Sequence, residues 1–542
     1  MRKALLYMGV FLLTSLSLAS QPAHASLQPT PGGALPWWND RVFYEIFVRS
    51  FYDSDGDGIG DLRGIIEKLD YLNDGDPNTT SDLGITGIWL MPIQASTRYH
   101  GYDVDDYRRI NRQYGTPEDL HALIEAAHTR GIVVIVDLVL NHTSYLHPWF
   151  QASLRGEQPF ADWYVWRDAD PGYRGPDNQQ VWHEYNGRYY YGVFWNGMPD
   201  LNLTNPEVTA ELYDIARYWL EDLGVDGFRL DAVKHYIEEG RQQENTQASI
   251  DWATAFNQHV ASIRSEALTV GEIWSSSFEV ARYVPDAVDL AFEFDLASAM
   301  IGGVSARNPG GVRSLTERAQ RLYPPGQYAA FLSNHDQNRV MSELRGNIPA
   351  AKTAASLLLT SPGVPFLYYG EEIGMMGTKP DEFIRTPMQW TSEEGTAGFT
   401  TAGRPWQPLS RDGRTFNVAD QSSDSESLLS HYRELIHLRN RSPALRHGDW
   451  LPLTSENSRV YAFLRHNQDE TLLVIINMDR RATDDYAITL NGLPDAPLRA
   501  QALFGIPPEI AIVQPEAAEN GWKPYAPLQE LPPYTTWIIR FS

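Results

Sequence analysis

Eight short apolar runs, separated by helix-like stretches, constrain the fold of this 542-residue chain more than any other feature of its sequence. Runs rich in β-branched residues that alternate with amphipathic segments predict parallel strands joined by helices. Pro117–Arg130 and Pro206–Leu223 are two of the helical candidates. The runs are Arg41–Phe51, Ile85–Pro92, Ile132–Leu138, Gly227–Val233, Leu268–Trp274, Val288–Asp295, Tyr328–Ser333 and Val364–Tyr369. Eight such strands favour a closed (β/α)8 TIM barrel over an open sheet.

Two regions interrupt or follow this pattern. Asn141–Asn205 is rich in Trp, Tyr, Gly and Pro and is too long for one helix, which predicts a domain inserted after the third strand. Beyond about Pro443 the pattern becomes one of alternating strands, which predicts a C-terminal antiparallel β domain. The expected domains are the barrel in two parts, 37–140 and 206–443, the insertion at 141–205, and the β domain at 444–542.

The N-terminus has the features of an export signal. An apolar stretch, Ala4–Ala19, follows Arg2 and Lys3 and leads to the small-x-small pattern Ala23–Ala25. This pattern predicts a signal peptide at 1–25, a polar linker at 26–36, and a secreted or periplasmic protein with no stable membrane association after cleavage. A membrane anchor is the alternative, but the apolar stretch is short for a bilayer span.

The amino-acid composition excludes several kinds of site and makes some binding partners improbable. The chain has no Cys, which excludes disulfides, thiolate-bound zinc and a cysteine nucleophile. A net charge of −25 argues against nucleic acid as a partner, because binding a phosphate backbone requires a basic surface. The 16 Trp and 28 Tyr residues supply flat faces that stack on sugar rings, although most such residues are part of a core. We expect a monomer that binds a neutral ligand such as a sugar.

Three carboxylates end apolar runs: Asp231, Glu272 and Asp336. In a barrel of this type the chemistry lies at the carboxyl ends of the strands, so these side chains are expected to converge. Cleavage of a glycosidic bond needs one carboxylic acid to protonate the leaving oxygen and one carboxylate to meet the oxocarbenium-like centre. For each residue taken alone, a helix N-cap or a buried ion pair is the favoured interpretation.

Four segments in order along the chain resemble the signature regions of the alpha-amylase family, glycoside hydrolase family 13. They are Asp137–His142, Gly227–His235, Glu272–Trp274 and Phe331–Asp336. Any one of them would be a weak signal, whereas their joint occurrence is specific. The resemblance spans Trp37 to the C-terminus and implies the barrel, the insertion (domain B) and the C-terminal β domain.

The resemblance also implies roles for single residues. Asp231 would be the nucleophile of a retaining reaction, Glu272 the acid/base, and Asp336 the stabiliser of the distorted sugar. Arg229 precedes the nucleophile by two residues on the same strand, so it points to the same side and can pair with it. The residues expected to bind substrate are Tyr102, Asp103, His142, Arg229, Lys234, His235 and His335.

An acidic, glycine-containing loop, Asp53–Asp61, has acids at alternate positions, an arrangement that wraps oxygen ligands around Ca2+. Gly64 occupies the position at which an EF-hand needs a bidentate Glu. The loop instead resembles the calcium loop of oligo-1,6-glucosidase-like members, and a solvated acidic turn is the alternative. The implied ligands are Asp53, Asp55, Asp57, Asp61 and the Ile59 carbonyl. Asn141 resembles the Asn that binds a second calcium in many alpha-amylases, with acidic partners that the sequence does not identify.

The substrate is narrowed only to an α-glucan. Met198–Asn202 mixes forms typical of oligo-1,6-glucosidases and of neopullulanases, while Ala232 stands where α-1,6-specific relatives usually have Val. We expect an alpha-amylase that cleaves α-1,4 bonds in starch and maltooligosaccharides. The alternatives are an α-glucosidase or oligo-1,6-glucosidase, a transglycosylase such as trehalose synthase, and a non-catalytic binding subunit. Such subunits typically lose the carboxylates that this chain retains.

Overall fold

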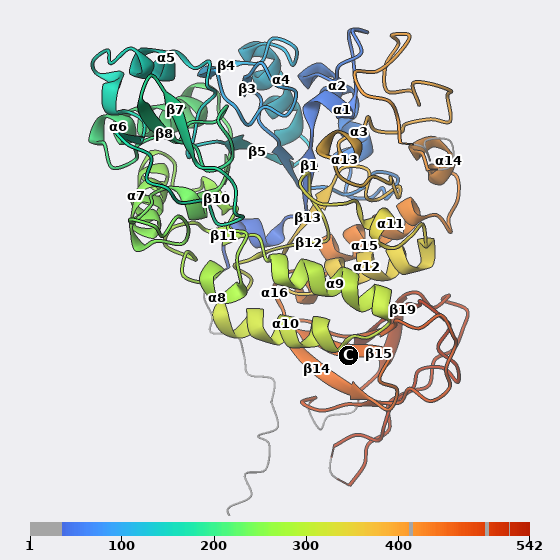
Figure 1. Ribbon diagram of the computed structural model, residues 1–542. Coiled ribbons are helices and arrows are strands. Elements are labelled where there is room, and N and C mark those ends of the chain that lie inside the picture. Colours follow the sequence, from blue (N-terminus) through green and yellow to red (C-terminus); the bar gives the residue numbers. More distant parts are fainter. Residues whose placement is uncertain (1–34, 411–415, 494–497, 520) are drawn as a thin grey trace, which may run out of the picture.

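Eight parallel strands form a closed barrel at the centre of the computed structural model, which describes residues 35–410, 416–493, 498–519 and 521–542 (Figure 1). The strands follow one another in the order β11-β10-β9-β5-β2-β1-β13-β12. A parallel bridge between Phe292 and Ala329 joins the two edges of this sheet and closes the ring. The bounds are β1 Phe43–Ile46, β2 Gly87–Leu90, β5 Val133–Leu138, β9 Gly227–Leu230, β10 Leu268–Gly271, β11 Leu290–Ala291, β12 Ala329–Phe331 and β13 Val364–Tyr368. The predicted barrel is thus confirmed.

Most strands are shorter than the apolar runs that predicted them. In the run Arg41–Phe51, the strand ends at Ile46 and a buried helical turn, α1 (Val48–Phe51), follows. In the run Val288–Asp295, only Leu290–Ala291 is strand, and a helix begins at Phe294. An apolar run shows that a segment is buried, but it does not distinguish a buried strand from a buried helical turn.

Inward-facing side chains change character along the barrel axis. Side chains alternate between the two faces of a strand, so residues two apart share a face. On β1 and β5, Phe43 and Ile135 belong to the apolar cluster inside the barrel, whereas Glu45 and Asp137, two residues later, are buried charged side chains. Arg229 on β9 pairs in register with Asp137. The barrel interior is therefore apolar towards the amino ends of the strands and charged towards their carboxyl ends.

Helices cover the outside of the barrel. The predicted helix Pro117–Arg130 is α4 (Pro117–His128), which begins with a capping box between Thr116 and Asp119. The predicted helix Pro206–Leu223 is α6 (Pro206–Arg217), continued by a π-helical turn, η3 (Tyr218–Asp222). The other helices of the barrel are α2 Leu62–Glu67, α3 Leu69–Leu72, α7 Gln247–Ile263, α8 Ser277–Val280, α9 Phe294–Ala306, α10 Gly310–Leu322, α11 Val340–Glu343, α12 Ile348–Thr360, α13 Asp381–Ile384, α14 Val418–Ser422, α15 Leu428–Arg441 and α16 Pro443–His447, with short turns η1 Trp37–Asp40 and η4 Val233–His235.

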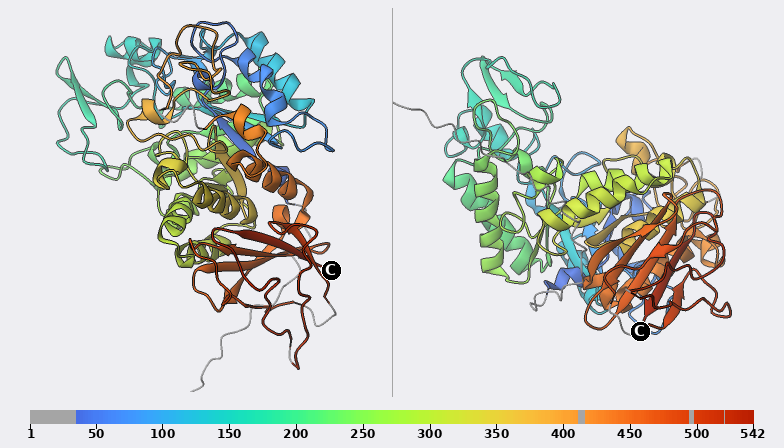
Figure 2. Two further views of the ribbon diagram at one scale, coloured as in Figure 1. Left: turned by 90° about the vertical axis from the view of Figure 1, so that its right-hand side faces the viewer. Right: turned by 90° about the horizontal axis from the view of Figure 1, so that it is seen from below.

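The long interval between β5 and β9 forms a separate lobe with its own small sheet (Figures 1 and 2). The sheet is antiparallel with the strand order β6-β8-β7, and Val181, Trp182, Tyr191 and Val193 form a distinct apolar cluster in this lobe. Its elements are α5 Pro148–Leu154, η2 Phe160–Asp162, β6 Trp166–Arg167, β7 Trp182–Tyr185 and β8 Arg188–Tyr191. A hairpin of β3 (Gln94–Ala95) and β4 (Asp106–Ile110) follows β2. The excursion predicted after the third strand is present.

The C-terminal part is a six-stranded sheet below α9 and α10 in Figure 1, with the order β17-β14-β15-β16-β19-β18. All its pairings are antiparallel, as predicted. The strands are β14 Asp449–Ser455, β15 Val460–His466, β16 Thr471–Asn477, β17 Ile488–Thr489, β18 Ala500–Phe504 and β19 Thr536–Phe541. Two fully buried arginines lie where this sheet meets the barrel: Arg439, on α15, donates to the carbonyls of Leu359 and Gly363, and Arg465, on β15, donates to that of Thr360 and so joins the sheet to α12.

The predicted signal peptide at 1–25 and most of the linker at 26–36 lie outside the described residues. Within the described part of the chain, none of the helices combines the length and apolarity that a membrane crossing requires.

Candidate active site

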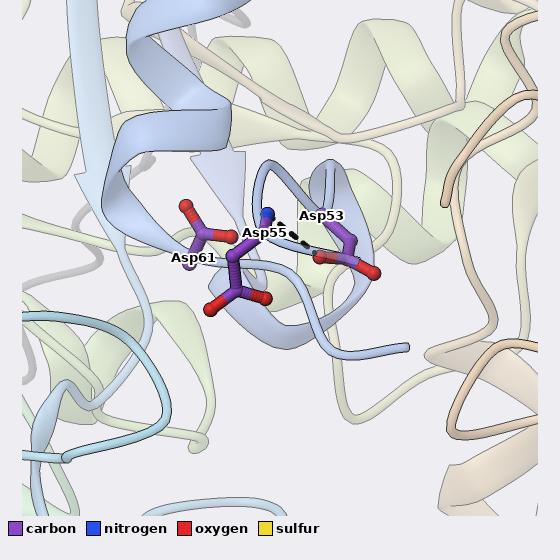
Figure 3. Close-up of side chains that lie close together, drawn as sticks. All are labelled: Asp53, Asp55 and Asp61. Atoms are coloured by element: carbon purple, nitrogen blue, oxygen red, sulfur yellow. Dashed lines mark hydrogen bonds between the residues drawn. The ribbon is translucent and has the colours of Figure 1, made fainter. Parts of the chain in front are cut away.

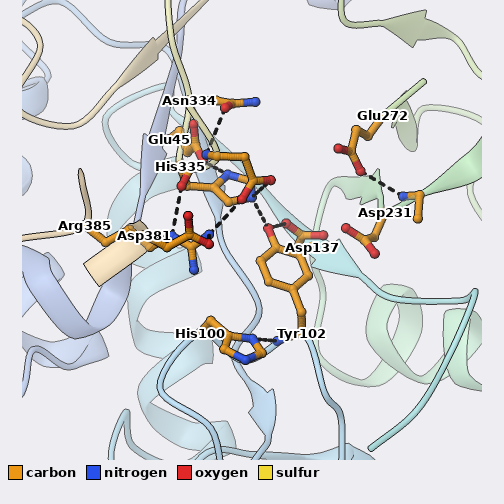
Figure 4. Close-up of polar contacts among 12 residues, drawn as sticks. Glu45, His100, Tyr102, Asp137, Asp231, Glu272, Asn334, His335, Asp381 and Arg385 are labelled. Carbon is orange, nitrogen blue, oxygen red and sulfur yellow. Dashed lines mark hydrogen bonds and ion pairs between the residues drawn. The ribbon is translucent and has the colours of Figure 1, made fainter. Parts of the chain in front are cut away.

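Arg229 ties the carboxylates together at the rim of the barrel. Asp231 directly follows β9, and Glu272 directly follows β10. The Arg229 guanidinium lies 2.7 Å from Asp231 (Nη1–Oδ1) and 3.1 Å from Glu272 (Nη2–Oε2). Adjacent parallel strands have brought the two carboxyl groups to the two ends of one guanidinium. Figure 4 shows Asp231 and Glu272 side by side at the ends of these strands. The backbone N–H of Ala232, a residue with φ of 51°, also donates to Glu272 Oε2 at 2.9 Å.

Asp137 is a third carboxylate on the same arginine, and the sequence suggested no role for it. Its Oδ1 lies 2.8 Å from Arg229 Nη1, while its Oδ2 accepts hydrogen bonds from Tyr102 Oη at 3.0 Å and Trp89 Nε1 at 3.2 Å. The signal that could have identified it is its inward position on β5, in register with Arg229.

Asp336 lies on the other side of this cluster and has its own cations. Its Oδ2 is 3.0 Å from His335 Nε2, and its Oδ1 is 2.8 Å from Arg385 Nη2. Arg385 also contacts Asp381 at 3.1 Å and donates from Nε to the His335 carbonyl at 2.9 Å. The other ring nitrogen of His335 contacts Glu45 Oε1. Sequence reasoning did not assign Arg385 or Glu45 to the site.

Protonation differs among the carboxylates. Burial raises the pKa of Asp231 and of Glu272, and although Arg229 opposes this effect, both remain raised. Burial also raises the pKa of Asp137, to about 7. Burial would raise the pKa of Asp336 as well, but His335 and Arg385 outweigh it and the pKa is lowered. One guanidinium carries a single positive charge and cannot keep three buried carboxylates ionised. The expected ion pair between Arg229 and Asp231 is therefore present, but it does not lower the pKa of Asp231 below its ordinary value.

Tyr102 and Asp103 line the site beside these carboxylates. The Tyr102 ring stacks on His335 with centroids 5.3 Å apart. Asp103 is buried, accepts a hydrogen bond from Ser96 Oγ at 2.8 Å, and lies 3.6 Å from Arg98 Nε. Burial raises its pKa to about 6. A hollow of about 310 Å3, bordered by Arg98, Asp103 and Trp195, opens next to it.

Two of the histidines predicted to bind substrate, His142 and His235, lie near one aromatic ring. Phe194, which is 42% exposed, lies with its ring centroid 5.2 Å from that of His142 and 5.7 Å from that of His235. His142 Nε2 contacts the Tyr102 carbonyl at 3.1 Å, and His235 Nδ1 contacts the Gln243 carbonyl at 2.9 Å. Lys234 Nζ lies 2.7 Å from Glu244 Oε2 and donates to the Trp274 carbonyl at 3.0 Å. Sequence reasoning missed Phe194, an exposed aromatic residue in a segment without periodicity.

Three of the predicted calcium ligands face one another in the loop between α1 and α2 (Figure 3). Asp53, Asp55 and Asp61 each offer an oxygen within 4.8 Å of the others. Asp57 does not belong to this group, and its Oδ1 instead accepts from the Ile59 N–H at 2.8 Å. Gly56 and Gly58 have φ of 80° and 91°, which lets the loop curl around the acids. The donor set is hard and anionic and suits a divalent cation such as Ca2+.

Asn141 has an acidic neighbour that the sequence could not identify. Its Oδ1 and Asp200 Oδ2 are both buried and make no hydrogen bond to any described residue. The two residues come together because the Leu201 N–H donates to the Asn141 carbonyl at 2.9 Å. Asp200 lies within Met198–Asn202, so this segment holds the carboxylate at the junction of the barrel and the inserted domain.

Comparisons with known proteins agree with this architecture. The family profile described as the catalytic domain of alpha amylase matches residues 45–448. Alpha-amylase 3 of Dictyoglomus thermophilum is 39% identical over 450 residues, covering 82% of this chain and 86% of that protein. Oligo-1,6-glucosidase of Heyndrickxia coagulans is 34% identical, covering 82% of this chain and 92% of that protein.

A solved structure shows that the similarity to alpha-amylases extends to the three-dimensional fold. The crystal structure of the alpha-amylase from H. orenii superimposes with a TM-score of 0.81 and 42% sequence identity, covering 93% of this chain and 99% of that one. The family match covers well over half of the chain, and the barrel and the rim carboxylates have the arrangement described above. The chain therefore belongs to the alpha-amylase family, glycoside hydrolase family 13.

Proposed function

We propose that this family member is an alpha-amylase: a retaining hydrolase of α-1,4-glucosidic bonds in starch and maltooligosaccharides. The observation that carries the proposal is the pair of carboxyl groups, Asp231 and Glu272, on the two ends of the Arg229 guanidinium. Retaining glycosidases hold their carboxyl groups about 5–5.5 Å apart, whereas inverting ones keep about 6.5–9.5 Å for a water molecule. Two groups that share one guanidinium suit the shorter spacing.

In the first step Asp231 attacks the anomeric carbon while Glu272 gives its proton to the leaving glycosidic oxygen. The carbon–oxygen bond breaks, and the sugar becomes covalently bound to Asp231. The raised pKa of Glu272 supports its role as the proton donor. Asp336, with its lowered pKa, supplies a fixed negative charge for the positive charge that develops on the sugar ring.

In the second step water replaces the departed sugar. Glu272, now a carboxylate, takes a proton from that water, and the oxygen attacks the anomeric carbon and displaces Asp231. Two inversions at one carbon give net retention of the α configuration. Transfer to a sugar hydroxyl instead of water would follow the same path and would make the protein a transglycosylase.

The relatives and the surroundings of the carboxylates support an α-1,4-glucan as the substrate. Two of the similar proteins are named alpha-amylases. Trp195 and Trp274 are 37% and 46% exposed; Trp195 borders the hollow at Asp103, and Trp274 follows Glu272 by two residues and stacks on Phe294. Exposed aromatic faces of this kind suit the apolar faces of further glucosyl units.

We further propose that Asp53, Asp55 and Asp61 hold Ca2+, which would fix the loop between α1 and α2 without taking part in the reaction. Without a cation these carboxylates repel one another, and in the structure they are satisfied largely by the N–H groups of their own loop. Asn141 and Asp200 are the residues proposed for a second ion. Export through the signal peptide at 1–25 and a monomeric state complete the proposal.

The test is to incubate the purified protein with starch, maltotriose, isomaltose, maltose and sucrose and to follow the product anomers by NMR. We expect α-anomers from starch and maltotriose to appear first. Activity confined to isomaltose would replace the α-1,4 assignment with that of an oligo-1,6-glucosidase, and trehalose formed from maltose would indicate a trehalose synthase. Initial β-anomers would refute the retaining mechanism. Asp231→Asn is the matched variant that should be inactive on every substrate.

A further inference from the structure

The ring of His335 lies between two carboxylates that come from different parts of the chain. Nδ1 is 2.5 Å from Glu45 Oε1, and Nε2 is 3.0 Å from Asp336 Oδ2. Nε2 also lies 2.7 Å from the Tyr102 hydroxyl oxygen. His335 and Glu45 are buried, with 0% and 2% of their surfaces exposed, so water does not compete for these contacts.

Counting hydrogen atoms fixes the charge of this ring. An ionised carboxylate only accepts hydrogen bonds, so a ring nitrogen that faces one must carry a hydrogen. Both nitrogens of His335 face carboxylates, and Arg385 at 2.8 Å holds Asp336 ionised. A neutral ring protonated only on Nδ1 would direct the lone pair of Nε2 at Asp336 Oδ2. With Glu45 ionised as well, these contacts require the imidazolium, with a hydrogen on each nitrogen.

The Tyr102 hydroxyl is consistent with this count. It donates its hydrogen to Asp137 Oδ2 at 3.0 Å, which leaves its oxygen free to accept the Nε2 hydrogen of His335. One continuous set of donors and acceptors thus runs from Glu45 through His335 and Tyr102 to Asp137.

We infer that Glu45 is a positioning residue of the reaction, which keeps His335 as the imidazolium and so holds its positive charge beside Asp336. Glu45 lies on β1 inside the barrel and acts only through His335. The inference rests on the proposed role of Asp336. A buried carboxylate is costly unless it is paired, and the hydrogen bond and charge of His335 are what offset the burial of Glu45.

The two carboxylates in contact with the ring outweigh the effect of its burial. Burial alone would lower the pKa of His335, but Asp336 and Glu45 outweigh it and raise this pKa to about 9. The Trp89 ring lies edge-on at 5.6 Å and carries no charge. The titratable and charged groups that face His335 or Glu45 are the acids Asp336, Asp137, Asp231 and Glu371, the cations Arg385 and Arg229, and the phenols Tyr102 and Tyr368.

Glu45→Gln tests the charge without changing the shape. The Gln side chain keeps an oxygen that accepts from Nδ1 but loses the negative charge, and removal of an opposite charge at this distance shifts a pKa by about 1–3 units. We expect the His335 pKa, and the alkaline limb of kcat with it, to fall by about 1–2 pH units. KM should change less than kcat, because Glu45 does not touch substrate. Glu371→Gln is the matched control, since Glu371 is a buried neighbour that bonds Tyr432 at 2.8 Å and not His335.

The ring itself is observed by NMR of protein labelled with 15N-histidine, with the His335 signals assigned by their loss in His335→Asn. The full-length wild-type protein should show hydrogens on both ring nitrogens at pH 7.5, and Glu45→Gln should lose one of them within the measured pH range. A singly protonated ring in the wild type, or an unchanged titration and pH profile in Glu45→Gln, would overturn the inference. The NMR readout does not need turnover, so absence of α-1,4 activity would refute the proposed function while leaving this test in place.

Discussion

Arg229→Lys is the substitution that tests the organisation of the site most directly. Arg229 makes three ion-pair contacts, at 2.7 Å to Asp231, 2.8 Å to Asp137 and 3.1 Å to Glu272. Lysine keeps the positive charge but concentrates it on one atom, so it cannot reproduce the two Nη atoms that hold Asp231 and Glu272 apart from each other. At least one charge-assisted contact is lost.

The magnitude follows from that loss. A hydrogen bond to a charged group contributes about 1.5–3 kcal/mol. If the lost contact aligns Asp231 or Glu272 in the transition state, kcat should fall by about 10- to 150-fold, at about 1.36 kcal/mol for each factor of ten. The substrate contacts themselves are untouched, so KM should change by a smaller factor.

The assay is steady-state hydrolysis of maltotriose, combined with thermal melting to confirm folding. Arg439→Lys is the matched control, because Arg439 is equally buried but contacts only backbone carbonyls at the junction with the C-terminal sheet. It should lower the melting temperature and leave kcat of the folded protein nearly unchanged. A folded Arg229→Lys variant that keeps kcat within a factor of about three would refute the reasoning.

Three further outcomes are expected. Glu272→Gln should lose hydrolysis of starch but still release an activated aryl leaving group that needs no protonation; equal loss on both substrates would contradict the acid role. Calcium should raise the melting temperature of the wild type and of Asp57→Asn more than that of Asp55→Asn, which keeps only the second proposed site. The three-Asp site should contribute a stabilisation of about 2.7 kcal/mol at 100 times its Kd, and an equal response of the two variants would exclude it. The hydrogen bond to Asp226 raises the pKa of His128 above its unfolded value of about 6.5, so its stabilisation is present below pH 6.5 and lost as pH rises through the folded pKa. The difference in unfolding free energy between wild type and His128→Gln should therefore be larger at pH 5.5 than at pH 9 in urea titrations, and a difference that grows with pH would be the wrong sign.

The sequence predicted the barrel because its signal is distributed over the whole chain. Each strand is an apolar run, and the period of the intervening helices is visible in segments such as Pro117–His128. The carboxylates Asp231 and Glu272 were also predictable from local sequence, because each directly follows an apolar run. Since the carboxyl ends of the strands meet at one rim of a closed barrel, two such residues lie close together in space.

Contacts between side chains far apart in the sequence were not predictable in this way. Glu45 and His335 are separated by 290 residues, and an inward Glu on a buried strand has no partner that periodicity could identify. Arg385 reaches Asp336 from a loop without a periodic pattern. The alternating acids of Asp53–Asp61 predicted four carboxylate ligands, but Asp57 forms a turn with its own loop, because a short acidic side chain can bond the backbone two residues on.

The two buried arginines at the junction of the barrel and the C-terminal sheet limit how the two domains can be exchanged between related proteins. Arg439 belongs to α15 and Arg465 to β15, yet both donate to carbonyls at or just after the end of α12. The carbonyl of Thr360 at the C-terminal end of α12 thus receives its hydrogen bond from Arg465, which lies about a hundred residues later in the C-terminal domain. Recombination that exchanged the C-terminal domain for one without Arg465 would leave the buried carbonyl of Thr360 unpaired, so the barrel and the C-terminal domain are expected to be inherited together.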